Sequence, residues 1–206
     1  MKRKRIFMLL AWFTLIGFSA IGLALIIFFQ EQSLSALFLE PMHWGLQLLI
    51  GTVVGYISAI LALKVIHLPW LQETNQFYTN LVQQFELSTT KIIFISLCAG
   101  VGEEILFRGA IQHWLGVVIT AIIFVAIHGY INPADWRISI YGIFMTLVMI
   151  LIGYMTVHLG LISSIAAHFM IDLVLLFKLS ADKPPVISTE PPAQSPNGIN
   201  ETETPK

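Results

Sequence analysis

The chain begins with an apolar run that is too long for an ordinary soluble core. Ile6 to Phe29 is 24 residues without a charge, and it directly follows four basic residues, Lys2 to Arg5. Such a run is long enough for a helix to cross the roughly 30 Å hydrocarbon core of a bilayer. The apolar part of a cleavable signal peptide is shorter, about 7–15 residues. The run therefore predicts a retained membrane-spanning helix.

Further apolar runs repeat along the chain, which is 56% hydrophobic and only 11% charged, against about 25% charged in soluble domains. We expect five more spans, over Trp44 to Leu63, Lys91 to Phe107, about Trp114 to His128, Ile138 to Val157, and Leu159 to Phe177. The predicted fold is an all-α, polytopic membrane bundle of about six transmembrane helices. Gly51-x-x-x-Gly55 would let two helices approach closely, and Gly160 predicts a tight turn between the last two spans.

The segment from Leu68 to Ser88 differs from the spans, because its apolar residues recur at helical spacing among Gln, Asn and Glu. It predicts either an interfacial helix or an ordinary helix that connects two spans. We therefore divide the chain into two spans with this amphipathic connector (residues 1–89), a core of four helices (residues 90–179), and a tail (residues 180–206). Six of the nine prolines lie in the tail, which predicts a disordered cytoplasmic segment.

The distribution of basic residues predicts the orientation. With the basic N-terminus in the cytoplasm, six spans also place the C-terminus there, and ten of the eleven basic residues lie at cytoplasmic ends. Arg108 is the exception. The net charge of −1 gives no sign of a nucleic-acid partner. We expect a multi-pass protein, and the small size favours a bacterial plasma membrane.

Ionisable residues inside the predicted spans are the candidates for function, because a charge at membrane depth costs several kcal/mol. They are Glu103, Glu104, His128, His168 and Asp172, with Arg108 close by. Counted at about 1.5 Å per residue, the positions converge on one layer in the middle to cytoplasmic part of the membrane. Any single one of these residues could instead be a polar residue that only holds helices together. The common depth of the whole set favours a functional site.

Local spacing divides these residues into groups. Glu104 and Arg108 are four residues apart, so they share a helix face and can pair. Glu103 points about 100° away from Glu104 and is free to face a cavity. The three carboxylates and Arg108 sum to −2 if both histidines are neutral, which a low-dielectric site does not hold uncompensated. Either protons on the histidines or a carboxylate, or a divalent metal, must balance the site, and both arrangements belong to hydrolytic chemistry.

Three motifs in order on separate apolar helices carry a resemblance: Glu103-Glu104-x-x-x-Arg108, Phe124-x-x-x-His128 and His168-x-x-x-Asp172. They resemble the CAAX protease and bacteriocin-processing (CPBP, or Abi) family of intramembrane endopeptidases, to which the Rce1-type prenyl-protein proteases belong. The resemblance covers roughly Lys91 to Phe177, so residues 90–179 would be the catalytic core. It implies a peptide or protein substrate presented at the lipid bilayer.

The resemblance also implies roles. Glu103 would be the general base that holds the attacking water together with His128. His168 and the residue at Asp172 would stabilise the oxyanion, and Glu104 with Arg108 would support the helix and Glu103. The family is described both as metal-dependent, with zinc as an example, and as a glutamate peptidase. Glu103, His128 and His168 would be the metal candidates.

One position departs from the commonest family pattern, which has Asn where this chain has Asp172. An amide can donate a hydrogen bond to an oxyanion, whereas a carboxylate donates only when protonated. Asp172 could instead orient or charge His168, which would then be the sole donor, or ligate a metal.

The predicted function is therefore endopeptidase activity of glutamic or metallo type. A non-catalytic immunity or scaffold protein of the same fold is one alternative, since the family includes members tied to bacteriocin self-immunity. A proton-coupled transporter is another, because intramembrane Glu, His and Asp also form proton relays. No internal repeat supports transport. The sequence does not name the substrate, and a prenylated one does not fit a bacterial source well.

Overall fold

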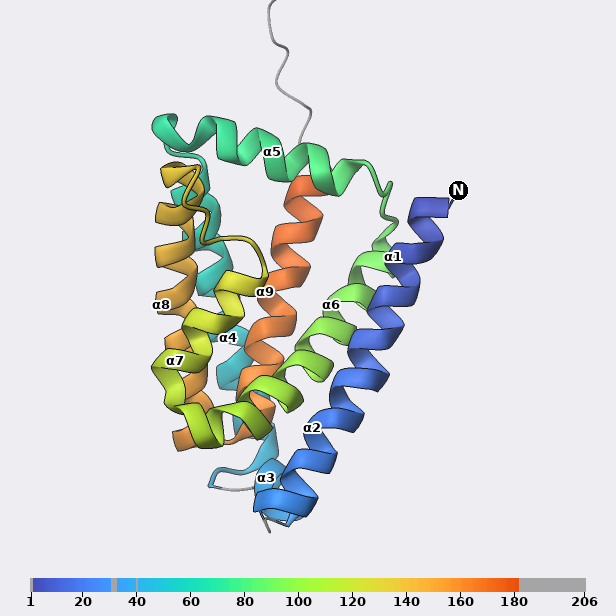
Figure 1. The fold of residues 1–206 in the computed structure, drawn as a ribbon, viewed down its shortest axis with the longest axis vertical. Helices are drawn as coiled ribbons and strands as arrows, with labels where there is room; N and C mark the ends of the chain where they lie inside the picture. The colour runs from blue at the N-terminus through green and yellow to red at the C-terminus, as the bar shows by residue number, and fades with distance from the viewer. Residues whose placement is uncertain (1, 31–32, 40, 182–206) are drawn as a thin grey trace, which may run out of the picture.

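Long helices run side by side through the structure, and short connections join them (Figure 1). The computed structural model describes residues 2–30, 33–39 and 41–181, and no strand occurs within these residues. The helices, including π-helical and 3-10 segments marked η, are α1 (Lys2–Phe13), η1 (Thr14–Phe18), α2 (Ser19–Leu25), η2 (Ile26–Gln30), α3 (Leu34–Leu39), α4 (Trp44–Ile66), η3 (Pro69–Leu71), α5 (Gln72–Gln83), α6 (Thr89–Glu104), η4 (Ile105–Ile111), α7 (Gln112–Ile127), α8 (Trp136–Leu159) and α9 (Leu161–Ala181). The predicted all-α bundle is confirmed.

Among the described residues, five helical stretches are long and apolar enough to cross a membrane: Arg5–Gln30, Trp44–Ile66, Thr89–Ile127, Trp136–Leu159 and Leu161–Ala181. Large apolar side chains cover their outer faces, and Phe28, Leu49 and Leu147 are each more than half exposed. Such a surface is stable in lipid and not in water. The chain is therefore an integral membrane protein.

The count is five rather than about six because the third and fourth expected spans are one helical stretch that turns back on itself. The chain descends through α6, turns through η4, and returns through α7 (Figure 1). Gly116, with φ 71°, breaks the helix within α7. The straight part after it, residues 117–127, is about 16 Å long, roughly half of the hydrocarbon core. The run from Trp114 to His128 is thus not a complete span.

The helix α5 lies across one end of the bundle, over the end of α9 (Figure 1). Its 3-10 extension is held to the start of α8, where the rings of Trp70 and Trp136 stack with centroids 6.1 Å apart and Arg137 pairs with Glu73. The connector predicted at Leu68 to Ser88 is therefore a helix packed on the bundle end. The N-terminus and the end of α9 lie at this same end (Figure 1). Apart from Ser180 and Ala181, which close α9, the predicted tail lies outside the described residues.

Glycines allow α4 and α9 to approach closely. A Cβ added at Gly51 would collide with the carbonyl oxygen of Ser163, and one added at Gly55 would collide with that of Ala167. The predicted small-residue pair therefore lies at a helix–helix interface. Gly160, with φ 113°, makes the turn from α8 into α9, as expected from the sequence. These contacts fix α9, which carries two of the candidate site residues.

We predict that Gly55→Ala lowers the free energy of unfolding by about 1–3 kcal/mol, because the added methyl group forces two packed helices apart. Thermal unfolding of the detergent-solubilised protein measures the effect. Gly45→Ala is the matched control, since a Cβ there would meet its nearest neighbour, His43, at an ordinary 3.4 Å. Equal melting temperatures for the two variants would contradict the proposed close packing.

Candidate active site

The two adjacent glutamates occupy the last turn of α6, and the π-helical segment η4 follows directly. π-helical turns within α-helices are rare and occur frequently at functional sites. Glu104 is fully buried, whereas the side chain of Glu103 is 12% exposed. The two neighbours therefore point into different surroundings, as their 100° separation predicts.

Glu104 lies at the centre of a buried polar network. Its Oε1 accepts a hydrogen bond from Nη1 of Arg108 at 2.9 Å and lies 2.7 Å from Nδ1 of His168. The guanidinium group of Arg108 also contacts Sδ of Met149 at 3.0 Å and lies 4.4 Å from the centre of the Phe124 ring. The predicted Glu104–Arg108 pair is present, and it is joined to α9 through His168.

Glu103 faces both histidines. Its Oε2 lies 3.5 Å from Nε2 of His128 and 3.9 Å from Nε2 of His168. This oxygen is buried and has no hydrogen-bond partner among the described residues. Buried polar atoms are nearly always satisfied, often by ordered water. The carboxylate of Glu103 and the imidazole rings of His128 and His168 therefore surround one polar position.

The backbone at the end of α7 holds His128. The positive φ of Gly129, 78°, ends the helix, and the N–H of Tyr130 donates to the carbonyl of Val125 at 3.3 Å, as in a Schellman motif. Nδ1 of His128 lies 2.6 Å from the carbonyl oxygen of Phe124. A carbonyl only accepts, so Nδ1 carries the proton. Nε2 is then the nitrogen directed at Glu103.

The same reasoning fixes His168. Its Nδ1 faces the carboxylate of Glu104, so this nitrogen is the donor. Nε2 faces Glu103 on one side and Oδ2 of Asp172 at 3.6 Å on the other. Asp172 lies one turn further along α9. The residue that orients the ring of His168 through Nδ1 is thus Glu104, while Asp172 lies beside Nε2.

A cavity of about 90 Å³ joins these groups, enough for about three water molecules at 30 Å³ each. Its polar lining residues are Glu103, His128, Tyr130, His168 and Asp172. Four of the six predicted site residues therefore line this cavity, and Glu104 and Arg108 do not. A neighbouring cavity of about 170 Å³ lies between α1 and α6 and also reaches Glu103, with a mainly apolar lining that includes Leu10 and Ile95.

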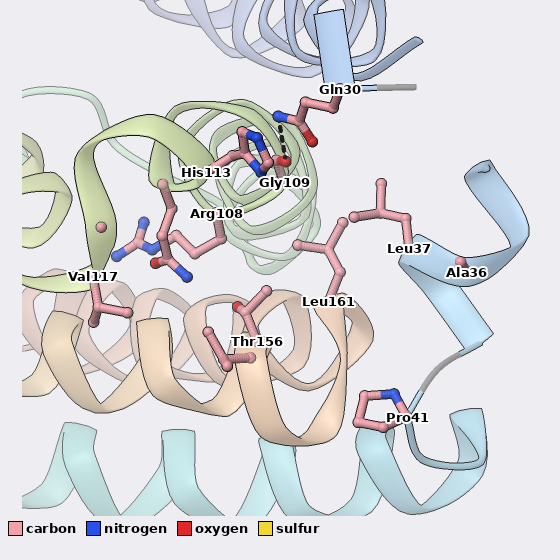
Figure 2. A pocket seen from close by; sticks show the side chains of 13 residues that line it. Gln30, Ala36, Leu37, Pro41, Arg108, Gly109, His113, Val117, Thr156 and Leu161 are labelled. Carbon is pink, nitrogen blue, oxygen red and sulfur yellow. Dashed lines mark hydrogen bonds between the residues drawn. The ribbon is translucent and has the colours of Figure 1, made fainter. Parts of the chain in front are cut away.

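A larger cavity, of about 480 Å³, lies on the other side of Arg108. Figure 2 shows its lining, with Gln30 reaching the carbonyl oxygen of Gly109 by a hydrogen bond of 3.3 Å. Neither of the histidines of the network and neither Glu103 nor Asp172 lines it. The larger cavity is therefore separate from the one that Glu103, His128, His168 and Asp172 line.

The predicted metal candidates are Glu103, His128 and His168. Within the part of the chain that the structure describes, no group of three or more His, Cys, Asp or Glu side chains has an arrangement that could hold a metal ion. The donor set therefore does not fit a protein-held zinc site in this arrangement. The unpartnered Oε2 of Glu103 fits a water molecule, whose partners would be Glu103 and His128.

Residues 85–174 match the family model described as type II CAAX prenyl endopeptidase Rce1-like, and this segment contains all six predicted site residues. The resemblance inferred from the three motifs is thereby confirmed. The match covers 90 residues, which are less than half of the chain. The chain is also similar to the uncharacterized protein YpbD of Bacillus subtilis (strain 168), with 35% identity over 88 residues, which are 42% of this chain and 44% of that protein. The likeness thus spans less than half of that relative. No solved structure matches significantly.

Sequence reasoning missed two features of the candidate site. The first is the contact from Glu104 to His168, which lie 64 residues apart, so no local spacing indicates it. The second is Tyr130, which lines the cavity. Its position two residues after His128 was the available signal. A tyrosine in a loop is neither charged nor within a predicted span, so the criteria of charge and membrane depth do not select it.

We predict that Arg108→Met lowers the free energy of unfolding by about 3–5 kcal/mol, because it leaves Glu104 as an uncompensated buried charge. The double variant Arg108→Met with Glu104→Gln removes both charges and keeps an acceptor for Nδ1 of His168. It should recover most of the loss. Denaturant or thermal unfolding in detergent measures both variants. A double variant less stable than the single one would contradict the pairing.

Proposed function

We propose that this protein is an intramembrane endopeptidase in which Glu103 and His128 activate a water molecule. The observation that carries the proposal is the unpartnered Oε2 of Glu103, which faces Nε2 of His128 at 3.5 Å and lies beside Nε2 of His168. A base must lie within reach of the proton that it takes, directly or through one water. A water molecule in the cavity satisfies this condition.

His128 positions that water. Because its Nδ1–H is committed to the carbonyl of Phe124, the neutral ring presents a lone pair at Nε2. Two acceptors, Nε2 and the Glu103 carboxylate, then face each other. A water molecule between them donates one hydrogen to each, which directs the lone pairs of its oxygen toward the substrate.

His168 is suited to stabilise the oxyanion. Its Nδ1–H is committed to Glu104, and a proton on Nε2 makes the ring a cation among the carboxylates of Glu103, Glu104 and Asp172. Arg108 compensates Glu104, and a proton on His168 reduces the predicted imbalance of −2 to −1 while His128 stays neutral.

The reaction balances with these groups alone. The water oxygen forms a bond to the scissile carbonyl carbon while Glu103 takes one of its protons, and negative charge develops on the carbonyl oxygen near His168. The tetrahedral intermediate then collapses. The carbon–nitrogen bond breaks, the proton on Glu103 passes to the leaving nitrogen, and the products are a carboxylic acid and an amine.

The surroundings favour a substrate presented from the membrane. The cavity between α1 and α6 reaches Glu103 and is lined mainly by apolar side chains. One of them, Leu10, is more than half exposed on the outer face of the helix. An extended peptide with apolar residues could pass from lipid to Glu103 along this side. The endopeptidase name of the Rce1-like family agrees with this function.

We predict that Glu103→Gln abolishes peptide cleavage, because an amide cannot take the proton from water, while membrane insertion stays normal. Comparative peptidomics of membranes that contain the wild type or the variant measures the products and nominates the substrate. Glu73→Gln is the matched control, since Glu73 is an exposed carboxylate that pairs with Arg137 far from the site.

Three outcomes distinguish the endopeptidase from the two alternative functions. Loss of the cleavage products only in Glu103→Gln supports the endopeptidase. Identical products in all three samples, together with a protective phenotype that survives in Glu103→Gln, would favour the immunity or scaffold protein. Proton flux in proteoliposomes that requires Glu103 would favour the transporter.

We also predict that exhaustive dialysis against a chelator leaves the cleavage rate unchanged, because the donor atoms of Glu103, His128 and His168 act on water directly. Elemental analysis of the purified protein accompanies the rate measurement. A rate that falls on dialysis and returns with one equivalent of zinc would overturn the glutamate mechanism and keep the endopeptidase.

A further inference from the structure

Tyr130 lies two residues after His128 and lines the same cavity. The Schellman motif at the end of α7 fixes its backbone, through hydrogen bonds from Tyr130 N–H to Val125 at 3.3 Å and from Gly129 N–H to Ala126 at 3.0 Å. The position of Tyr130 relative to His128 is therefore set by one rigid turn.

Packing from two other helices holds the residue in place. Gly142 of α8 lies against the carbonyl and Cβ of Tyr130, where any larger residue would collide. The ring lies 5.3 Å from that of Tyr78 on α5 and 5.6 Å from that of Tyr141 on α8, measured between centroids. Tyr78 and Tyr141 do not line the cavity. Of this cluster, only Tyr130 reaches the site.

The hydroxyl group of Tyr130 has no hydrogen-bond partner among residues 2–30, 33–39 and 41–181. Burial is the largest cause that raises the pKa of this phenol well above its usual value, followed by the neighbouring Tyr141 and Tyr78 and the charges of Asp172 and Glu103. The group therefore stays protonated at neutral pH. It is a hydrogen-bond donor beside carboxylates that only accept.

The proposed reaction lacks one donor. Oxyanion sites hold the developing charge with preorganised hydrogen-bond donors, and His168 supplies one. Asp172 supplies none while it is ionised. We propose that the hydroxyl group of Tyr130 donates a hydrogen bond to the carbonyl oxygen of the scissile peptide, beside His168. This inference rests on the proposed function, and the tyrosine keeps its proton throughout the reaction.

The test uses Tyr130→Phe, which keeps the ring, the turn and the packing and removes only the donor. The peptide whose Glu103-dependent cleavage is fastest in the peptidomic comparison is synthesised, and kcat and KM are measured with the full-length protein in proteoliposomes. We expect kcat to fall about a hundredfold with KM nearly unchanged, as when one oxyanion donor is removed elsewhere. The control Tyr141→Phe removes a hydroxyl group from the same cluster and should leave both constants unchanged.

The outcomes distinguish a failure of the role proposed for Tyr130 from a failure of the proposed endopeptidase function. Glu103-dependent cleavage that is as fast in Tyr130→Phe as in Tyr141→Phe would overturn the role of Tyr130 and leave the endopeptidase intact. A rise in KM with kcat unchanged would also overturn it, because it would show uniform binding rather than stabilisation of the transition state. No Glu103-dependent product at all would overturn the proposed function and this inference with it. Equal melting temperatures for the two variants would exclude a folding defect.

Discussion

The site depends on one buried carboxylate, that of Glu104. A single oxygen atom accepts hydrogen bonds from Arg108 and His168, so it joins the end of α6 and η4 to α9. In a low-dielectric interior such charge-assisted bonds are strong when complete and costly when one partner is missing. The network therefore has few alternative arrangements. It sets the proton of His168 on Nδ1 and leaves Nε2 for the cavity, as a fixed partner does for catalytic histidines generally.

The fixed position of Glu104 determines where the side chain of the adjacent Glu103 points. Because consecutive helical residues point about 100° apart, fixing Glu104 in the protein interior directs Glu103 into the cavity toward Nε2 of both histidines. Oε1 of Glu104 has two partners, Arg108 and His168, whereas Oε2 of each glutamate is buried without a hydrogen-bond partner among the described residues. An unsatisfied buried acceptor costs stability, and proteins retain such costs most often at functional sites. The proposed function thus gives support to Glu104 and chemistry to Glu103.

The sequence predicted what local periodicity and membrane depth can reveal. The apolar runs, the pairing of Glu104 with Arg108 and the close approach at Gly51 and Gly55 all follow from spacing along a helix. The same reasoning brought Glu103, His128, His168 and Asp172 to one layer, and the structure brings them to one cavity. Long-range partners do not follow from spacing, so the contact from Glu104 to His168 was missed. The break at Gly116, which shortens the fourth expected span, was missed as well, because an apolar pattern does not indicate the sign of φ.

The segment that matches the Rce1-like family, residues 85–174, does not build the surroundings of the site alone. The helix α5 precedes it and places Tyr78 against Tyr130, while α1 and η1 precede it and line the apolar cavity at Glu103. Gly102 lies so close to the backbone of Thr14 that no side chain fits between them. The N-terminal helix is therefore seated directly beside the last turn of α6. The proposed catalytic groups lie within the matched segment, whereas one of the two walls of the apolar cavity, formed by residues from Phe7 to Thr14, lies outside it. If the proposed function holds, the N-terminal helices are therefore where we expect differences in substrate choice between relatives.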